Sequence, residues 1–450
     1  MVSFCKKALS FHLGIRTNSW KTHHRLAAVR LLLYIIIVQI KSKFKEFAHK
    51  MKEKPVFSGI ICEFNPLHRG HALLLQQAKW HSDAVVCVMS GNWVQRGEPA
   101  ILSKFARAQM AIACGADLVA ELPLPWACAG AERFAMGGVS LLDSFGCIRQ
   151  LWFGSECGSA ELLETTGQIL LSDAFSRELP TYLKKGISFA AARQATVSSL
   201  AGETYASLLD SANNILGIEY CKAISQLHSS VIPHTISRIG HAHDSDAPIR
   251  TGDFPSASQL RAMLSENQDI TAFLPKTAAE ILLEQQTLGL CPSDFRRLET
   301  AVIARLRCME KSDFTRLPDV SEGLENRLYR ACQTALSLEE LYDAIKSKRY
   351  SHARIRRLVV SAFLQIPASL PEAPPYFRIL AMNETGREIL HIASKTSHIP
   401  ILSRPRDFWN AGEEIRQLFT LEQRATDLFA LTLPSPPACG WDCRYKIFVR

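Results

Sequence analysis

Short apolar runs alternate along residues 56–239 with stretches in which apolar residues recur every three to four positions. The first pattern predicts buried strands and the second predicts amphipathic helices. The predicted strands cover 56–62, 84–90, 117–121, 150–153 and 231–239, and predicted helices start near His68, Ser103 and Ala129. Regular alternation of strands and helices predicts an α/β fold with a doubly wound parallel sheet.

The pattern changes twice after this region. Residues 267–366 show helical spacing with few strand signals, and residues 375–433 mix short strands with a helix. We therefore predict an α/β domain over 55–265, an α-helical domain over 266–366 and a small α/β region over 367–450.

The first 54 residues differ from the rest in charge. Residues 1–50 hold ten Lys or Arg and one acidic residue, which leaves 42 basic and 42 acidic residues after them. Their apolar run, residues 31–38, is too short to span a bilayer. With Met51 just before the first strand, we interpret residues 1–54 as a basic extension that is disordered or not native. Because the rest is neutral, an RNA site would have to be a local patch.

The thirteen cysteines are odd in number and mostly lie in apolar runs. This usage is typical of reduced thiols in a cytoplasmic protein. Because the apolar run at 31–38 is too short to span a bilayer, we also expect no membrane association. Cys439 and Cys443 have no matching pair or nearby histidines, and we interpret them as structural. The sequence predicts no dedicated metal site.

The junction between the first strand and its helix carries the clearest chemistry. Pro66 suits the approach to a helix, and Gly70 allows the backbone to come close to a ligand. His68 and His71 lie on the same side of the first helical turn, whose free N–H groups attract an anion. The pattern predicts a phosphate site, although a purely structural junction can have the same residues.

Other candidates follow along the chain. Lys104 and Arg107 lie in the first turns of the helix capped by Ser103, and Arg261 follows a predicted cap at Ser256. These side chains could contact phosphates, including those of an RNA, or be ordinary exposed charges. Asn213 can pair with a base or ribose edge, or cap the following helix.

A basic run, KSKRYSHARIRR, occupies residues 346–357 and contains Tyr350 and His352. Its six cations are Lys346, Lys348, Arg349, Arg354, Arg356 and Arg357. Such a run can neutralise phosphates while an aromatic ring stacks on an unpaired base. A helix with a solvated basic face is the other interpretation, and we favour RNA binding because the body is otherwise neutral.

A set of ordered motifs gives a more specific indication. In sequence order they are ICEFNPLHRGH, VMSGNWVQRGEPAILSKFARA, DLVAELP, FGSE, NNILGIEY, SRIG, SASQLR, VSEGLENRL, KSKRYSHARIRRLV and RILAMNETGREIL. Together they resemble the tRNA(Met) cytidine acetate ligase family of HIGH-type nucleotidyltransferases over nearly all of residues 55–450. The sequence departs from the usual family pattern at Leu67, Arg69, Ala212 and Ala242. No motif histidine is lost, but Arg69 alters the charge near the expected phosphates.

The resemblance implies a Rossmann-like nucleotidyltransferase domain that activates acetate with ATP and acetylates N4 of wobble cytidine 34 of elongator tRNA(Met). His68 and His71 would then stabilise charge at the reacting phosphates. The ATP contacts that the family implies are Ile61, Cys62, Glu63, Phe64, Asn65, Pro66, Leu67, His68, Arg69, Gly70, His71, Ala72, Leu73, Leu74, Gly154, Asn213 and Arg238. Mg²⁺ is expected to accompany ATP.

Two alternatives stay open. One is a small-molecule adenylyltransferase of the same superfamily, which would bind ATP and ignore tRNA. The other is a non-catalytic RNA-binding protein, whose RNA affinity would survive the loss of His68 and His71. The general base for acetyl transfer, the discrimination between tRNAs and the oligomeric state are not specified by the sequence.

Overall fold

The computed structural model describes residues 55–238, 254–321, 323–347, 350–369 and 371–450. Residues Val56–Arg450 form one compact unit, distinct from Met1–Pro55. The predicted extension over 1–54, the departure at Ala242, and Lys348 and Arg349 lie outside the described residues.

The central sheet begins with β1, whose six residues are all buried. Its strands, in sequence order, are β1 (Phe57–Cys62), β2 (Ala84–Ser90), β5 (Leu118–Leu122), β6 (Ile148–Ser155), β7 (Ile232–Ser237), β8 (Phe377–Met382), β9 (Ile401–Leu402) and β10 (Phe448–Val449). The order across the sheet is β10-β8-β5-β2-β1-β6-β7, with β9 beside β8. The five strands from β5 to β7 are mutually parallel, and β8 joins β5 antiparallel.

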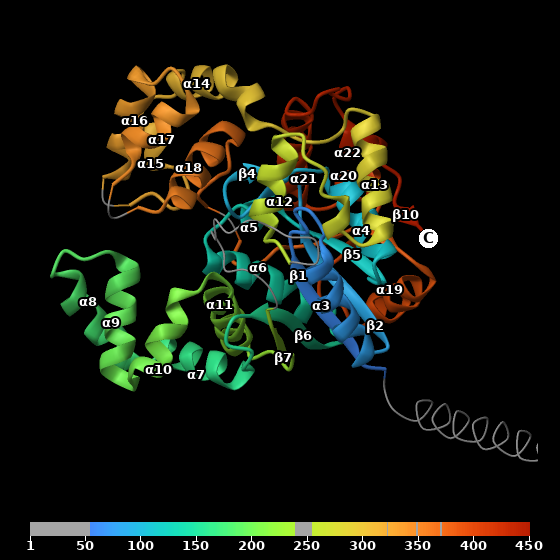
Figure 1. Ribbon diagram of the computed structural model, residues 1–450, viewed down its shortest axis with the longest axis horizontal. Coiled ribbons are helices and arrows are strands. Elements are labelled where there is room, and N and C mark those ends of the chain that lie inside the picture. Colours follow the sequence, from blue (N-terminus) through green and yellow to red (C-terminus); the bar gives the residue numbers. More distant parts are fainter. Residues whose placement is uncertain (1–54, 239–253, 322, 348–349, 370) are drawn as a thin grey trace, which may run out of the picture. The chain divides into compact units, whose positions relative to one another are not determined.

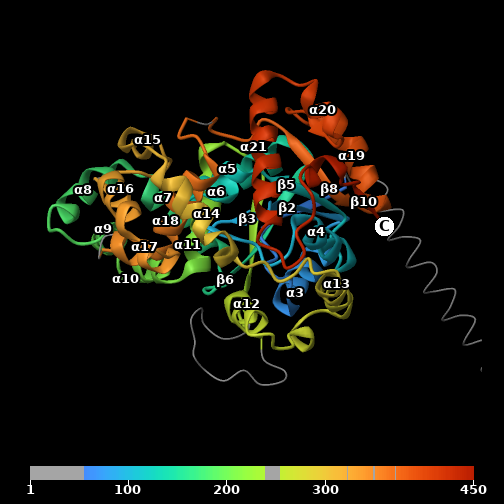
Figure 2. The same ribbon diagram turned by 90° about the horizontal axis from the view of Figure 1, so that it is seen from above.

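Helices cover both faces of this sheet (Figure 1; Figure 2). The longer ones around it are α3 (Arg69–Trp80), α4 (Lys104–Ala113), α6 (Ala131–Ser144), α7 (Ala160–Leu171), α11 (Ala212–Gln226), α12 (Ala257–Ser265), α13 (Lys276–Thr287), α19 (Glu384–Thr396) and α21 (Glu413–Ala430). Two further helices, α8 (Asp173–Leu183) and α9 (Phe189–Ala201), project away from the sheet beyond α7 (Figure 1). Ile61 of β1 packs in the core with α6, α11 and α19, whereas Ile60 packs in the core with α3, α4 and α13. Burial on both faces explains why β1 reads as a continuous apolar run.

A third core lies within the helical region. It is built on α14 (Glu299–Arg307), α15 (Lys311–Thr315), α16 (Leu324–Thr334), α17 (Leu338–Ile345) and α18 (His352–Leu364). Trp93, Leu124 and Phe429 of α21 pack into the same core. Shorter helices are α5 (Leu124–Ala127), α10 (Glu203–Ala206), α20 (Pro405–Trp409) and α22 (Trp441–Arg444).

The α/β fold with a mostly parallel sheet is confirmed. The sequence did not predict a short antiparallel pair, β3 (Trp93–Val94) and β4 (Glu98–Pro99), because two-residue strands carry no periodicity. It also did not predict that the strands of 367–450 extend the main sheet through β8. Among the described helices, none has the length and apolarity that a bilayer crossing requires.

A buried charge cluster joins the C-terminal elements to the sheet. We define it as Lys104 of α4, Glu121 of β5, Arg378 of β8, Glu422 of α21 and Asp442 of α22, all buried. The Lys104 ammonium lies 2.7 Å from Glu121 and 2.9 Å from Asp442. The Arg378 guanidinium lies 3.1 Å from Glu121 and 2.7 Å from Asp442. Desolvated charges of this kind are stable only when paired.

Candidate functional site

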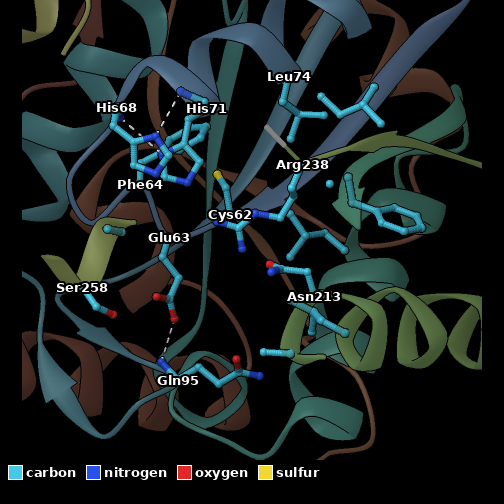
Figure 3. A pocket seen from close by; sticks show the side chains of 18 of the residues that line it. Cys62, Glu63, Phe64, His68, His71, Leu74, Gln95, Asn213, Arg238 and Ser258 are labelled. Carbon is cyan, nitrogen blue, oxygen red and sulfur yellow. Dashed lines mark hydrogen bonds between the residues drawn. The ribbon is translucent and has the colours of Figure 1, made fainter. Parts of the chain in front are cut away.

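A cavity of about 300 Å³ opens at the carboxyl ends of β1 and β6 (Figure 3). Between these two strands the strand order reverses, since β2 and β5 lie on one side and β7 lies on the other. In open α/β sheets, this switch point is where ligands bind. The lining residues come from the β1–α3 junction, the loop after β3, α6, the end of β6, α11, the end of β7 and α12.

Two imidazoles form one wall of the cavity (Figure 3). His68 is the N-cap of α3, and its Nδ1 accepts a hydrogen bond from the Gly70 N–H at 3.0 Å. The His71 Nδ1 accepts in turn from the His68 N–H at 3.4 Å. The rings stack with their centroids 3.8 Å apart. With Nδ1 accepting, each neutral ring carries its proton on Nε2, so both can donate hydrogen bonds.

Both histidines are neutral near pH 7. Burial lowers the pKa of His68 to about 4, and the nearby Arg238 guanidinium adds to this effect. Burial, His68 and Arg238 hold the pKa of His71 well below its ordinary value. The pair therefore offers hydrogen-bond donors, while the positive charge at this part of the cavity comes from Arg238.

Three guanidinium groups also line the cavity, those of Arg96, Arg238 and Arg261. Arg261 donates through Nη1 to the Asn65 carbonyl at 2.9 Å and pairs through Nη2 with Glu98 at 3.2 Å. The predicted cap of α12 is present, because Ser256 and Gln259 form a reciprocal capping box. The cap fixes the turn that carries Arg261 toward the cavity.

Asn213 lines the cavity beside Glu156. Its Nδ2 donates to the Glu156 Oε1 at 2.6 Å. Ser211, rather than Asn213, is the N-cap residue of α11, so the capping alternative for Asn213 is wrong. Asn214 has a structural part, since its Oδ1 accepts from the backbone N–H groups of Glu156 and Cys157. The Asn213 amide is thus held at the cavity edge from α11.

Twelve of the seventeen predicted ATP contacts line the cavity: Ile61, Cys62, Glu63, Phe64, His68, Gly70, His71, Leu73, Leu74, Gly154, Asn213 and Arg238. The other five, Asn65, Pro66, Leu67, Arg69 and Ala72, do not. Asn65 is buried and its Oδ1 accepts from the Ile101 N–H at 2.7 Å, while Leu67 lies in the core. Arg69 is exposed and borders a separate hollow with Lys79 and Trp80.

The predicted phosphate or tRNA contacts at Lys104 and Arg107 are corrected by the structure. Lys104 is fully buried in the charge cluster, paired with Glu121 and Asp442. Arg107 is also fully buried and donates to the carbonyls of Leu102, Glu63, Ser90 and Gly91. Arg107 therefore stabilises the turn after β2 from inside, whereas Lys104 is held in the charge cluster.

The basic run is largely engaged within the protein. Lys346 donates to the Tyr350 carbonyl at 3.1 Å, and Arg354 donates to the Asp319 carbonyl and the Ser321 hydroxyl, each at 2.8 Å. Tyr350 is 6% exposed, so its predicted stacking on a base is wrong for this conformation. Arg357 donates to the Gln95 carbonyl at 3.2 Å.

Two described arginines of this run form ion pairs, and Arg356 is the more accessible of the two. Its side chain is 42% exposed and pairs with Glu98 at 3.7 Å. Glu98 also binds Arg261, so one carboxylate joins the cavity to α18.

Sequence reasoning missed several cavity residues. Gln95 and Arg96 lie in the polar stretch after β2, where a ligand loop is expected, so a signal was present. Phe134, Phe153 and Tyr220 form an apolar part of the lining and look like ordinary core residues in the sequence. Within the described residues, no group of three or more His, Cys, Asp or Glu is arranged to hold a metal ion.

The chain matches known proteins over most of its length. The family model described as HIGH Nucleotidyl Transferase matches residues 56–439. A tRNA(Met) cytidine acetate ligase from Acetivibrio thermocellus is 37% identical over 84% of this chain and 95% of that protein. Another protein of that name, from Thermoanaerobacter sp., is 36% identical over 85% of this chain and 97% of its own length.

Solved structures agree with these matches. Crystal structures of Thermotoga maritima TmcAL, one apo and one bound with alpha-thio ATP, superpose with TM-scores of 0.83 and 0.80. Each is 30% identical and covers 88% of this chain and 100% of its own. By sequence and by fold, the chain belongs to the tRNA(Met) cytidine acetate ligase family of the HIGH nucleotidyl transferases.

Proposed function

We propose that this chain uses ATP to activate acetate as acetyl-adenylate and transfers the acetyl group to N4 of cytidine 34 of elongator tRNA(Met). The relatives' names support the substrate and the reaction, and the alpha-thio ATP in the TmcAL crystal supports the nucleotide. The observation that carries the proposal is the pair of neutral, stacked imidazoles at the sheet's switch point.

The cavity suits the first step. An acetate oxygen attacks the α-phosphorus of ATP, the bond to the β-phosphate oxygen breaks, and diphosphate leaves. Negative charge gathers on the phosphoryl oxygens, so catalysis depends on placed donors more than on a protein nucleophile. His68 and His71 would donate through Nε2, and Arg238 would supply positive charge.

Mg²⁺ would enter with the nucleotide. Glu63 is the one acidic side chain among the described residues that line the cavity, and a single carboxylate is consistent with an ion held chiefly by phosphate oxygens. We expect ATP turnover to require the ion, and acetate-dependent exchange of diphosphate into ATP, measured with and without Mg²⁺, tests this.

The tRNA would approach from the side of α18. Arg356 and the exposed His352 at the start of this helix are the groups that we propose for contact with the RNA. Because Arg356 shares Glu98 with Arg261, RNA on this helix would lie close to the nucleotide cavity. A tRNA substrate supports our proposal that the activity is cytoplasmic.

The decisive experiment incubates the full chain with ATP, labelled acetate and unmodified elongator tRNA(Met), and then identifies the modified nucleoside by mass spectrometry. We expect N4-acetylcytidine that disappears when ATP or acetate is omitted, or when position 34 carries uridine. ATP hydrolysis or nucleotide transfer without acetylated tRNA would favour the small-molecule adenylyltransferase. RNA binding that is unchanged in a variant lacking both histidines, with no turnover by wild type, would favour a non-catalytic protein.

A further inference from the structure

Acetyl transfer to cytidine requires a proton acceptor. The lone pair of the exocyclic amine is delocalised into the cytosine ring, so the amine is a weak nucleophile and gains positive charge as it attacks. A base that removes one amine proton during the attack lowers this barrier, typically by a factor of about 10² to 10⁴. The base has to face the cavity and be unprotonated before the attack.

Glu63 meets the geometric condition. It follows the last residue of β1 directly, and its side chain lines the cavity. Its Oε1 accepts a hydrogen bond from the Gln95 N–H at 2.9 Å. Figure 3 shows the carboxylate pointing away from the two imidazoles, toward Gln95. The carboxylate and the imidazoles therefore address different parts of a bound acetyl-adenylate.

The surroundings of Glu63 suit proton transfer. Burial raises the pKa of this carboxyl above its ordinary value, while the Gln95 N–H and the Arg261 guanidinium oppose the rise. A carboxylate with a raised pKa is a stronger base than one in water. The other cavity groups are poorer acceptors, because His68 and His71 already use Nδ1 and the arginines stay protonated.

We propose that Glu63 is the proton acceptor in acetyl transfer, an inference that rests on the function proposed above. The N4 lone pair forms a bond to the acetyl carbonyl carbon, and the bond from that carbon to the phosphate oxygen breaks. AMP leaves with the electron pair of that bond. The N4 proton passes to the Glu63 carboxylate, which later releases it to water, so no further reactant is needed.

The loop between β3 and β4 links the Glu63 carboxylate to α18 in the helical region. Gln95 donates its N–H to Glu63 and accepts at its carbonyl from Arg357 of α18. The same α18 backbone packs against Gly97, where an added Cβ would lie 2.6 Å from the Arg356 carbonyl carbon. Arg357 thus acts as a positioning residue for the base through one intervening residue.

The test separates the two half-reactions. Acetate-dependent exchange of diphosphate into ATP reports activation, and a single turnover of pre-formed acetyl-adenylate on unmodified elongator tRNA(Met) reports transfer. We expect Glu63→Gln to slow transfer by about 10²-fold or more, and to slow exchange far less than transfer. Glu63→Asp keeps the charge at a shorter reach and should slow transfer by about tenfold. Glu384→Gln, at a side chain 78% exposed on α19, is the matched control and should change neither rate.

Any other result would count against Glu63 as the proton acceptor. Transfer at the wild-type rate in Glu63→Gln would show that the proton goes elsewhere. Equal loss of exchange and transfer would show that Glu63 acts in nucleotide binding. If Glu63→Gln does not fold, Glu63→Asp decides by the same comparison of the two rates. If wild type exchanges but acetylates no tRNA, the proposed function fails, and the assignment of Glu63 fails with it.

Discussion

At the scale of single residues, the two histidines have two roles at once. The His68 imidazole caps α3 through Nδ1, and His71 completes the reciprocal bond to the His68 N–H. The same bonds leave Nε2 of each ring for a ligand. Under the proposed function, local folding and ligand binding would use opposite edges of each imidazole.

This division gives a prediction that separates the cap from the donor. Asn is a good N-cap residue, so His68→Asn should keep α3 stable while losing the Nε2 donor. We expect acetate-dependent ATP–diphosphate exchange to fall by about 10²–10³-fold in His68→Asn and in His71→Ala. His391→Ala, at an exposed histidine of α19, is the control and should exchange normally. Normal exchange in His68→Asn would contradict the donor role.

At the scale of elements, the loop between β3 and β4 meets α18 closely. Gly97 has φ +73°, and a Cβ there would lie 2.6 Å from the Arg356 carbonyl carbon. Gly186, between α8 and α9, has a similar φ of +77° but nothing within 4 Å of its Cβ position. The two glycines thus share a backbone conformation and differ in their surroundings.

Alanine at both positions tests the contact. Gly186→Ala should show only the cost of the left-handed backbone, about 1 kcal/mol. Gly97→Ala adds displacement of α18, and its free energy of unfolding should fall by a further 1–3 kcal/mol or so. Urea unfolding of the two variants measures this difference. Equal losses in both variants would mean that the loop and α18 do not pack as described.

The elements themselves were largely predictable from sequence, and the reasons are physical. A strand buried on both faces, such as β1, is apolar throughout. The start of a helix such as α12 can be recognised from its capping box. Pairings between distant segments leave no such local signal. Lys104 and Arg107 look like exposed charges on a helical turn, yet their partners include Asp442, more than 300 positions away.

The candidate site was predictable where local chemistry defined it. The local motif at the β1–α3 junction was enough to identify its two histidines as site residues. The family resemblance added Asn213 and Arg238, and all four side chains line the cavity. The apolar lining at Phe134 and Tyr220 has no local signature, because core residues and cavity residues have the same composition. Tyr350 was misread for the converse reason, since an aromatic residue in a basic run gives no sign of its own burial.

At the scale of the whole molecule, the buried charge cluster connects α4, β5, β8, α21 and α22. The cluster contains three carboxyl groups and only two cationic groups. Glu422 is the carboxyl group that forms no ion pair with either cation among the described contacts. Burial, and then the charge of Glu121, raise the pKa of Glu422 to about 8. Near neutral pH, Glu422 is therefore mainly protonated in the folded protein and charged in the unfolded chain.

The stability of the protein should depend on pH accordingly. A raised folded-state pKa favours folding fully below the ordinary value of 4.5, and this contribution is lost as the pH rises through about 8. Glu422→Gln keeps an oxygen for the Leu124 N–H and cannot ionise. We expect its advantage in free energy of unfolding over wild type to grow from pH 5 to pH 9. Urea unfolding across this range measures the advantage.

The exposed Glu414 lies on the same helix, and Glu414→Gln provides the control. Its unfolding profile should run parallel to that of wild type at every pH. A Glu422→Gln advantage that is constant with pH would show that this carboxyl does not gain a proton on folding.

The position of β8 in the sheet bears on how the chain is made. β8 pairs with β5 across more than 250 residues, and β10, at Phe448–Val449, pairs with β8. A ribosome must therefore translate nearly the whole message before this edge of the sheet can form. Until then, the β5 edge of the nascent chain exposes unpaired backbone groups that invite association with other chains. Cells that make this protein should need to shield that edge during synthesis.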